Sequence, residues 1–202
     1  MIGVITIREL TREDLPAAVG IIARGMRDNP LHVAALGADA DARGRRLIRM
    51  FTVALPLIYS KGILLGAFER DTLVGLAGMV APGYCQPTFM EKLSMMPRFV
   101  PAVGGGGFAR VGRWMAAWAQ HDLKQAHWHL GPVAVDVDMQ GHGIGGALMK
   151  EYCARLDRQH VAGYLETDKA ANVTFYERFG FETIGSAQVL DVPNWFMKRS
   201  AR

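Results

Sequence analysis

The stretch Gln140-Gly141-His142-Gly143-Ile144-Gly145-Gly146 decides the fold, because it joins a predicted strand to a predicted helix. The strand covers residues 127–135, and a long amphipathic helix runs over residues 143–160. The first turn of a helix has free N–H groups at the positive end of its dipole, and glycines let an anion approach them. The segment therefore predicts a phosphate or pyrophosphate site.

The same glycines leave two other interpretations open. Gly141-x-Gly143-x-x-Gly146 also satisfies the dinucleotide-binding fingerprint, and Glu166 lies 20 residues beyond Gly146, where that fold places its ribose-binding acid. However, the 36 residues after Glu166 are too few for the remaining parallel strands, and residues 136–140 separate the strand from the first glycine. A tight turn that merely packs the helix is the third interpretation. The coincidence of strand, glycines and helix favours a phosphate site over such a turn.

The patterns on either side of this stretch predict an α/β or α+β chain around one mixed sheet. Strands are expected at 4–9, 62–69, 73–81, 127–135, 164–166, 182–189 and 194–198, and helices at 11–27, 41–59, 110–120, 143–160 and 171–179. Residues 82–108 hold four prolines and the run Gly104–Gly107, which predicts a long loop with a helical turn at 90–96 and a flexible hinge. No repeat or linker is visible, so one domain over residues 1–202 is expected.

Composition excludes several classes of protein. Half of the 202 residues are hydrophobic and 21% are charged, which argues against a disordered chain, and two cysteines are too few for a disulfide scaffold. No apolar run is long enough to span a membrane, and the first residues lack the layout of a signal peptide, so a cytoplasmic protein is expected. The net charge of +4 is too mild to favour nucleic acid but suits an anionic small ligand. Four arginines at 43, 45, 46 and 49 predict a solvated helix face.

Two blocks resemble the motifs of the GCN5-related N-acetyltransferases, the GNAT superfamily. Val133-Ala134-Val135-Asp136 followed by Gln140-x-x-Gly143-x-Gly145 resembles the family's acetyl-CoA pyrophosphate motif, and residues 172–181 (NVTFYERFGF) resemble its N-x-x-F-Y-x-x-x-G-F block. Residues 127–132 (HWHLGP) and 164–167 (YLET) further resemble the subgroup of puromycin N-acetyltransferase. The resemblance implies a single GNAT-type domain. Its sheet is mixed, mostly antiparallel, of six to seven strands flanked by helices, with a splayed central pair of strands.

The resemblance also implies acetyl-CoA as cosubstrate and assigns its binding residues. The loop amides that would hold the pyrophosphate are those of Gly141, His142, Gly143, Ile144, Gly145 and Gly146, with Gln140 at the family's Gln/Arg position. The pantetheine would pair with the strand residues Val133, Ala134 and Val135, and the Val133 N–H would stabilise the oxyanion. Asn172, Phe175 and Tyr176 complete the expected cofactor site, although Phe175 also fits a core position.

Tyr176 matches the family's general acid, which gives a proton or a hydrogen bond to the leaving thiolate. His129 aligns with the strand position where histone acetyltransferases of the family carry a glutamate base, and Glu69 and Glu166 are alternatives. His121, His127 and His129 lack a matching cysteine or carboxylate pair in the sequence pattern, so no metal is expected. Nothing around Cys85 or Cys153 suggests a nucleophile.

These assignments predict an N-acetyltransferase that acts by direct attack of a primary amine on acetyl-CoA, the acceptor being a small antibiotic- or metabolite-like molecule. A peptide or protein N-acetyltransferase and a non-catalytic acyl-CoA sensor are the alternatives. Neither nucleic acid nor a membrane is an expected partner, and a homodimer is left open. The acceptor residues should come from the first two helices and residues 82–108.

Overall fold

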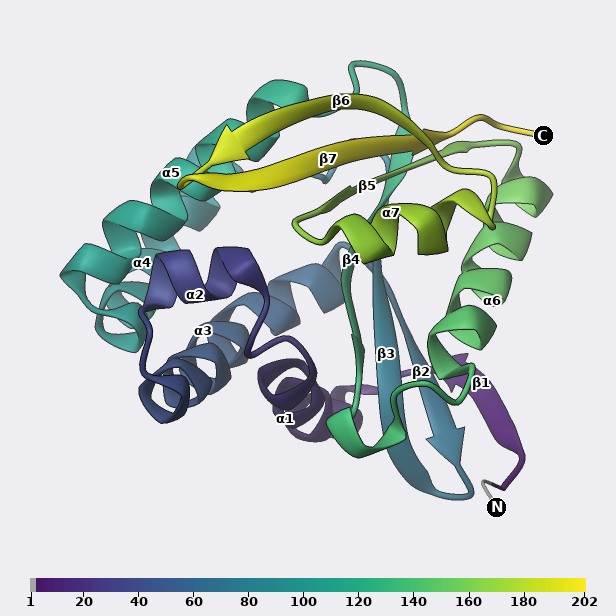
Figure 1. The fold of residues 1–202 in the computed structure, drawn as a ribbon, viewed down its shortest axis with the longest axis horizontal. Coiled ribbons are helices and arrows are strands. Elements are labelled where there is room, and N and C mark those ends of the chain that lie inside the picture. Colours follow the sequence, from purple (N-terminus) through teal and green to yellow (C-terminus); the bar gives the residue numbers. More distant parts are fainter. Residues whose placement is uncertain (1–2) are drawn as a thin grey trace.

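The computed structural model describes residues 3–202, so Met1 and Ile2, the first residues inspected for a signal peptide, lie outside the described residues. Its strands form one seven-stranded sheet in the order β1-β2-β3-β4-β5-β7-β6 (Figure 1). The strands are β1 (Ile5–Glu9), β2 (Gly62–Glu69), β3 (Thr72–Val80), β4 (His127–Val135), β5 (Ala162–Thr167), β6 (Glu182–Val189) and β7 (Val192–Arg199). Among these described strands, β4 and β5 alone pair in parallel. The mixed, mostly antiparallel sheet is therefore confirmed.

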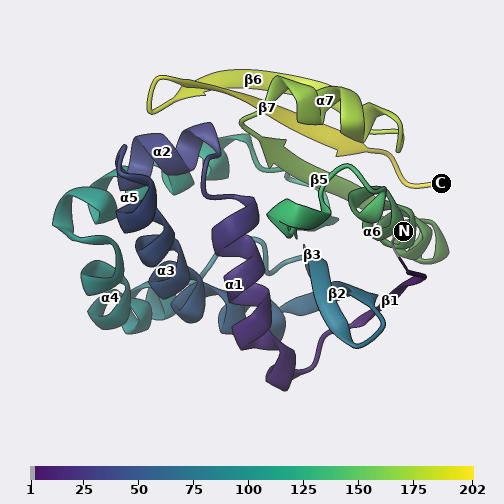
Figure 2. The ribbon, with the colours of Figure 1, turned by 60° about the horizontal axis from the view of Figure 1, so that its bottom comes forward.

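Helices cover both faces of the sheet and enclose two hydrophobic cores (Figures 1 and 2). One face carries α1 (Leu15–Gly25), α2 (Pro30–Leu36), α3 (Ala40–Ser60), α4 (Phe89–Val103) and α5 (Gly105–His121), and the other carries α6 (Ile144–Gln159) and α7 (Ala170–Glu177). Two short 3-10 turns, η1 (Arg12–Asp14) and η2 (Val137–Met139), precede α1 and α6. Alternating residues at the end of β4 separate the two cores, since Val133 and Val135 pack with the core of α6 whereas Ala134 packs with the first helices.

The sheet opens between β4 and β5. These strands pair at His127, Trp128 and His129 and then separate. On the other side of β4, the pairing with β3 is irregular at Gly78, where an added Cβ would collide with the Gly131 carbonyl oxygen. Pro132 has no N–H to donate to a neighbouring strand. The predicted splayed central pair is thus present.

Most predicted elements are confirmed, and the differences have local causes. Pro30 does not merely stop the first helix but occupies the first position of α2, where its missing N–H costs nothing. Residues 82–108 are not a long loop, because Thr88 and Glu91 form a capping box that starts α4. The glycine run is not a flexible hinge: Gly104, with φ +76°, separates α4 from α5, and Gly105 begins α5.

The expectation of a solvated arginine face on α3 is wrong for Arg43. Its side chain is 4% exposed, and its guanidinium donates to the Gly37 carbonyl and to the Asp28 carboxylate. Arg45, two residues on, is exposed as expected. None of the helices in the part of the chain described here has the length and apolarity needed to cross a bilayer.

Candidate active site

The glycine-rich loop leads into α6 in the way the sequence predicts. Gly141 and Gly143 both have φ +82°, a left-handed conformation that side chains rarely adopt, and a Cβ at either would meet no atom within 4 Å. Gly143 is the N-cap of α6, so the amides of the first helical turn that follow it have no partner within the helix. The loop therefore presents bare amides to open space, as an anion site requires.

Gln140 holds this loop to the strand before it. Its side-chain Nε2 donates to the Val135 carbonyl oxygen at 3.1 Å. Asp136, the residue after Val135, forms an ion pair with Arg24 of α1. The loop is thus tied both to the end of β4 and to the first helix.

The last part of β4 has a free edge beside the loop. Val133, Ala134 and Val135 pair with Ala77, Leu76 and Gly75 of β3, whereas the described pairing with β5 ends at His129. A linear ligand could add to this edge in the manner of a strand, with its anionic end on the loop. The structure thus brings the predicted β4 residues and the predicted loop residues into one continuous surface.

The helix α7 places Tyr176 and Asn172 on the far side of the opening. Tyr176 is 6% exposed, and its burial, aided by the charge of Asp168, raises the pKa of the phenol well above its usual range. Asn172 donates to the Thr167 hydroxyl at 3.2 Å, which directs it to the end of β5. A Cβ at Gly145 would lie 3.6 Å from the Phe175 ring, so Phe175 packs against the start of α6.

His129 is paired with a carboxylate in the structure. Its Nε2 donates to Glu166 Oε2 at 2.8 Å, and the side chains are 16% and 2% exposed. Burial disfavours the imidazolium, but the Glu166 charge and the Cys85 side chain outweigh it and raise the pKa of His129 to about 10. The two candidate bases therefore form one unit. Glu69 lies away from it, at the turn between β2 and β3, where it accepts from the Gly3 amide.

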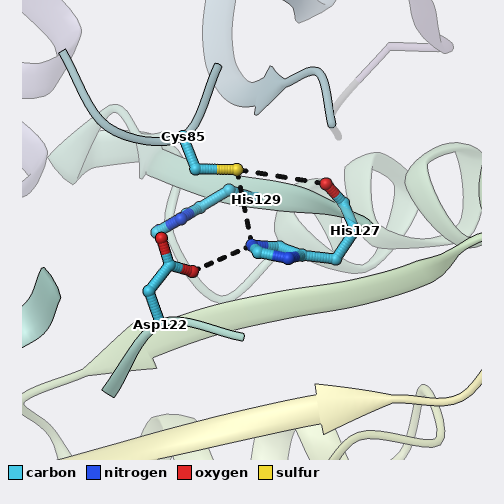
Figure 3. A group of neighbouring side chains, drawn as sticks. All are labelled: Cys85, Asp122, His127 and His129. Carbon is cyan, nitrogen blue, oxygen red and sulfur yellow. Dashed lines mark hydrogen bonds and ion pairs between the residues drawn. The ribbon is translucent and has the colours of Figure 1, made fainter. Parts of the chain in front are cut away.

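Sequence reasoning missed a second cluster beside this pair, formed by Cys85, Asp122, His127 and His129 (Figure 3). Cys85 Sγ lies 3.4 Å from His127 Nε2, although 42 residues separate them, and Asp122 Oδ1 lies 3.0 Å from the same nitrogen. The hydrogen bonds from the histidines outweigh burial and lower the pKa of the Cys85 thiol to about 7. The His127-x-His129 pattern was the visible signal, but its partners lie on separate elements. His121 instead stacks on Phe196, with ring centroids 4.0 Å apart.

Two shallow surface hollows contain none of these residues. One, of about 380 Å³, lies at the starts of β4 and β5 and includes Gln125 and His160, and the other, of about 320 Å³, lies at the β6–β7 hairpin. Neither contains a predicted catalytic or cofactor residue. The free edge of β4 and the loop before α6 therefore remain the candidate ligand-binding surface.

A mixed sheet whose parallel central strands separate beside a glycine-rich helix start defines an α/β fold of the acetyltransferase type. Residues 102–183 match the family model of the acetyltransferase (GNAT) domain. The matched region includes β4, the loop, α6, β5 and α7, which carry all the predicted site residues.

Individual proteins are similar to this chain in sequence or in fold. A mycothiol acetyltransferase of Brachybacterium faecium is 43% identical over 56 residues, which are 26% of this chain and 17% of that protein. The solved structure of a Corynebacterium glutamicum protein, described as histone acetyltransferase HPA2 and related acetyltransferase, has a TM-score of 0.77 at 23% identity, covering 98% of this chain and 97% of that one. A Brucella melitensis GNAT acetyltransferase, solved in complex with acetyl-CoA, has a TM-score of 0.55 at 18% identity, covering 98% and 88%.

Proposed function

We propose that this protein is an acetyl-CoA-dependent N-acetyltransferase that transfers the acetyl group to a primary amine of a small molecule by direct attack. The observation that carries the proposal is the continuity of the bare amides before α6 with the free edge of β4. A pyrophosphate and a pantetheine arm have the charge and the shape to occupy these two surfaces. The acetyl-CoA in the Brucella structure of the same fold supports the choice of ligand.

In this proposal the cofactor is held mainly by backbone groups. The amides of residues 141–146 bind the pyrophosphate, and Gln140 fixes the loop through Val135. The pantetheine pairs along Val133, Ala134 and Val135, and Asn172 and Phe175 border the arm from the side of α7. The thioester then lies where β4 and β5 separate. There the Val133 N–H stabilises the oxygen that becomes negative during attack.

The transfer forms a C–N bond and breaks the C–S bond of the thioester. The neutral amine attacks the acetyl carbon, a tetrahedral oxyanion forms, and its collapse expels the CoA thiolate. Tyr176 gives that thiolate a proton or hydrogen bond, and its raised pKa keeps the phenol protonated at neutral pH. The proton that the amine loses must leave on the opposite side of the opening.

We propose that the His129–Glu166 pair accepts that proton, either directly or through a water molecule. An imidazole whose pKa is raised to about 10 is already protonated at neutral pH, so it is poorly suited to accept another proton. The carboxylate is the better acceptor, and His129 positions it. We therefore propose Glu166, one of the alternatives to His129, as the base, with His129 as its partner.

A small amine is favoured as the acceptor. The relative from Brachybacterium faecium is named for acetylation of mycothiol, a small molecule, although the match covers a minor part of that protein. The acceptor would approach from the face of α1–α5, which carries His129 and Glu166. There, Asp168 Oδ2 accepts from the Leu31 amide at 2.8 Å and joins α2 to the end of β5, so α2 borders the opening.

An amine panel tests the proposal. Purified protein is mixed with acetyl-CoA and aminonucleosides, polyamines, aminoglycoside-like amines or peptide N-termini, and free CoA thiol is measured. We expect thiol release with small amines and acetylated product by mass spectrometry. Tight binding of CoA with no turnover over the whole panel would favour the acyl-CoA sensor, and turnover confined to peptides would favour the peptide acceptor.

A further inference from the structure

Four side chains, of which only His129 takes part in the proposed acetyl transfer, converge between three elements. Cys85 comes from the loop after β3, Asp122 follows α5, and His127 and His129 lie on β4 (Figure 3). One ligand atom from each, a thiol, a carboxylate oxygen and two imidazole nitrogens, lies within 4.8 Å of all the others. The group is buried or half-buried, so bulk water does not satisfy it fully.

Each of the two histidines has one ring nitrogen bonded outside this group. His127 Nδ1 donates to the Gln125 carbonyl at 2.9 Å, which directs Nε2 toward Cys85 and Asp122. His129 Nε2 donates to Glu166, and its Nδ1 is buried with no hydrogen-bond partner among the described residues. A histidine that ligates a metal is held in this way, with its second nitrogen bonded to a carboxylate or a backbone carbonyl.

We propose that Cys85, Asp122, His127 and His129 bind a divalent zinc ion as a closed, four-coordinate structural site. Thiolate, imidazole and carboxylate are the ligands that zinc takes in proteins. Zinc–ligand bonds of about 2.0–2.3 Å in a tetrahedron place the ligand atoms roughly 3.3–3.8 Å apart. The observed 3.4 Å and 3.0 Å separations at His127 Nε2 are close to that spacing.

Charge and orientation agree with a zinc ion. When the ion displaces the protons of its ligands, a thiolate and a carboxylate with two neutral imidazoles carry the two negative charges that a divalent ion neutralises. Asp122 is aimed by Gln86, whose side-chain amide donates to Oδ2 at 2.9 Å and leaves Oδ1 toward the cluster. Gln86, Gln125 and Glu166 thus supply outer hydrogen bonds for three of the four ligands.

A cysteine nucleophile with a histidine base explains the geometry less well. Such a triad needs the thiol on one imidazole nitrogen and the orienting carboxylate on the other. Here Cys85 and Asp122 both face Nε2 of His127, and Nδ1 is bonded to the Gln125 carbonyl. Two acceptors that converge on one nitrogen can only divide its single N–H between them, whereas both can bind a metal ion together with it.

A metal at this place would connect the core of the sheet to the acceptor side. It would join the loop before α4 and the end of α5 to β4, and through His129 it would fix the position of Glu166. The ion therefore acts as a positioning element rather than as a participant in acetyl transfer.

Metal binding by the full chain is measured without reference to activity. Protein stripped with a chelator is titrated with zinc against a chromophoric competitor, and the metal content is determined by mass spectrometry. We expect one zinc per chain, bound at least tenfold more weakly by Cys85→Ser and by Asp122→Asn. The control Cys153→Ser, at a buried cysteine whose weak contact is with the Phe179 carbonyl, keeps the affinity of the natural chain.

Two readouts on the natural chain keep the test decisive if a variant does not fold. Cobalt in place of zinc should give tetrahedral absorption bands with a thiolate-to-metal charge-transfer band, and zinc should slow alkylation of Cys85. If the natural chain binds no zinc at micromolar concentrations, or if cobalt shows no thiolate band, the proposal is overturned. The cluster would then be a hydrogen-bonded polar group without metal.

Discussion

The Nε2 atom of His129 donates to Glu166 Oε2 at 2.8 Å, and His129 is the last residue of β4 that pairs with β5. Glu166 lies two residues beyond the β5 partner of His129, so the hydrogen bond spans the point where the strands begin to separate. The carboxylate side chain is 2% exposed and faces the side from which an acceptor would enter. This contact ties the proposed proton acceptor to the strand that holds the thioester.

Replacement of this carboxylate tests the assignment of the base. Glu166→Gln keeps the shape and the hydrogen-bonding ability of the side chain but removes its capacity to accept a proton. We expect kcat to fall by about 10²-fold, the lower end of the usual contribution of a general base, with little change in the KM for acetyl-CoA. Steady-state kinetics with a small amine measures this effect.

The matched control is Glu182→Gln at the exposed start of β6, which should leave kcat unchanged. A Glu166→Gln enzyme with normal kcat would show that the proton leaves by another route. His129→Asn is expected to lower kcat by a smaller factor, because it removes the partner of the carboxylate and not the acceptor itself.

The role of Tyr176 is tested by removal of a single oxygen atom. Tyr176→Phe should lower kcat by about 10–100-fold while the KM for acetyl-CoA changes less than twofold, because the hydroxyl acts on the leaving thiolate. Burial raises the pKa of this phenol, so its acid form persists below that value and the loss should be constant between about pH 6 and pH 9. A pH–rate profile of both enzymes measures the ratio.

Tyr59→Phe in α3 provides the control, since this tyrosine packs at the edge of the helical core. Unaltered kcat of Tyr176→Phe at saturating substrate would rule out the acid. A loss that shrinks as the pH rises through the neutral range would show that the phenol of Tyr176 titrates lower than its burial implies.

The cofactor half of the site could be predicted from sequence because its chemistry is local. The loop from Gln140 to Gly146 and the helix after it are consecutive, and the glycines that permit the turn also leave the amides free. Asn172 and Tyr176 are four residues apart on one short helix. For residues this close in the sequence, the number of residues between them determines how they lie relative to one another in the fold.

The acceptor half and the cysteine–histidine cluster depend on contacts that no spacing reveals. Cys85 meets His127 because the β3–α4 loop lies over the start of β4, and Asp122 joins them from the end of α5. Arg43 was expected to be solvated, but carbonyl groups at the end of α2 and the Asp28 carboxylate surround its guanidinium. Helical periodicity identifies a polar position but not the partner that burial brings to it.

The conformation of Gly143 gives a test of the phosphate loop. At φ +82° an L-amino acid is strained by about 1–2 kcal/mol, and a side chain would also point into the space proposed for the pyrophosphate. Gly143→Ala should raise the Kd for CoA by about tenfold, and Gly143→Asp should raise it further because its charge repels the phosphates. Calorimetric titration with CoA measures the affinity.

The matched control is Gly112→Ala in the middle of α5, where an added Cβ meets no atom within 4 Å. That change should leave CoA affinity unchanged and stabilise the protein by about 0.5–1 kcal/mol, because alanine favours the helix. Equal CoA affinity in the natural chain and in a folded Gly143→Asp would place the phosphates elsewhere.

Asp168 offers a test of how the helical half is held to the site. Its carboxylate accepts from the Leu31 amide at 2.8 Å, in the first turn of α2, where the N-cap residue Asn29 provides no side-chain hydrogen bond. Asp168→Ala leaves this buried amide without its acceptor, so unfolding free energy should fall by about 2 kcal/mol. The KM for the amine should rise more than the KM for acetyl-CoA, because α2 borders the acceptor side.

Asp168→Asn separates the effect of the hydrogen bond to the Leu31 amide from the effect of the carboxylate charge. An asparagine oxygen can still accept from the Leu31 amide, so most of the stability and the amine KM should return, although the charge near Tyr176 is lost in both variants. Thermal unfolding and steady-state kinetics of the pair measure the difference. If Asp168→Asn and Asp168→Ala show the same stability and kinetics, the negative charge acting on Tyr176 matters more than the hydrogen bond that holds α2. Because the carboxylate raises the pKa of that phenol, its loss would then make the acid stronger and shift the basic limb of the pH–rate profile downward in both variants.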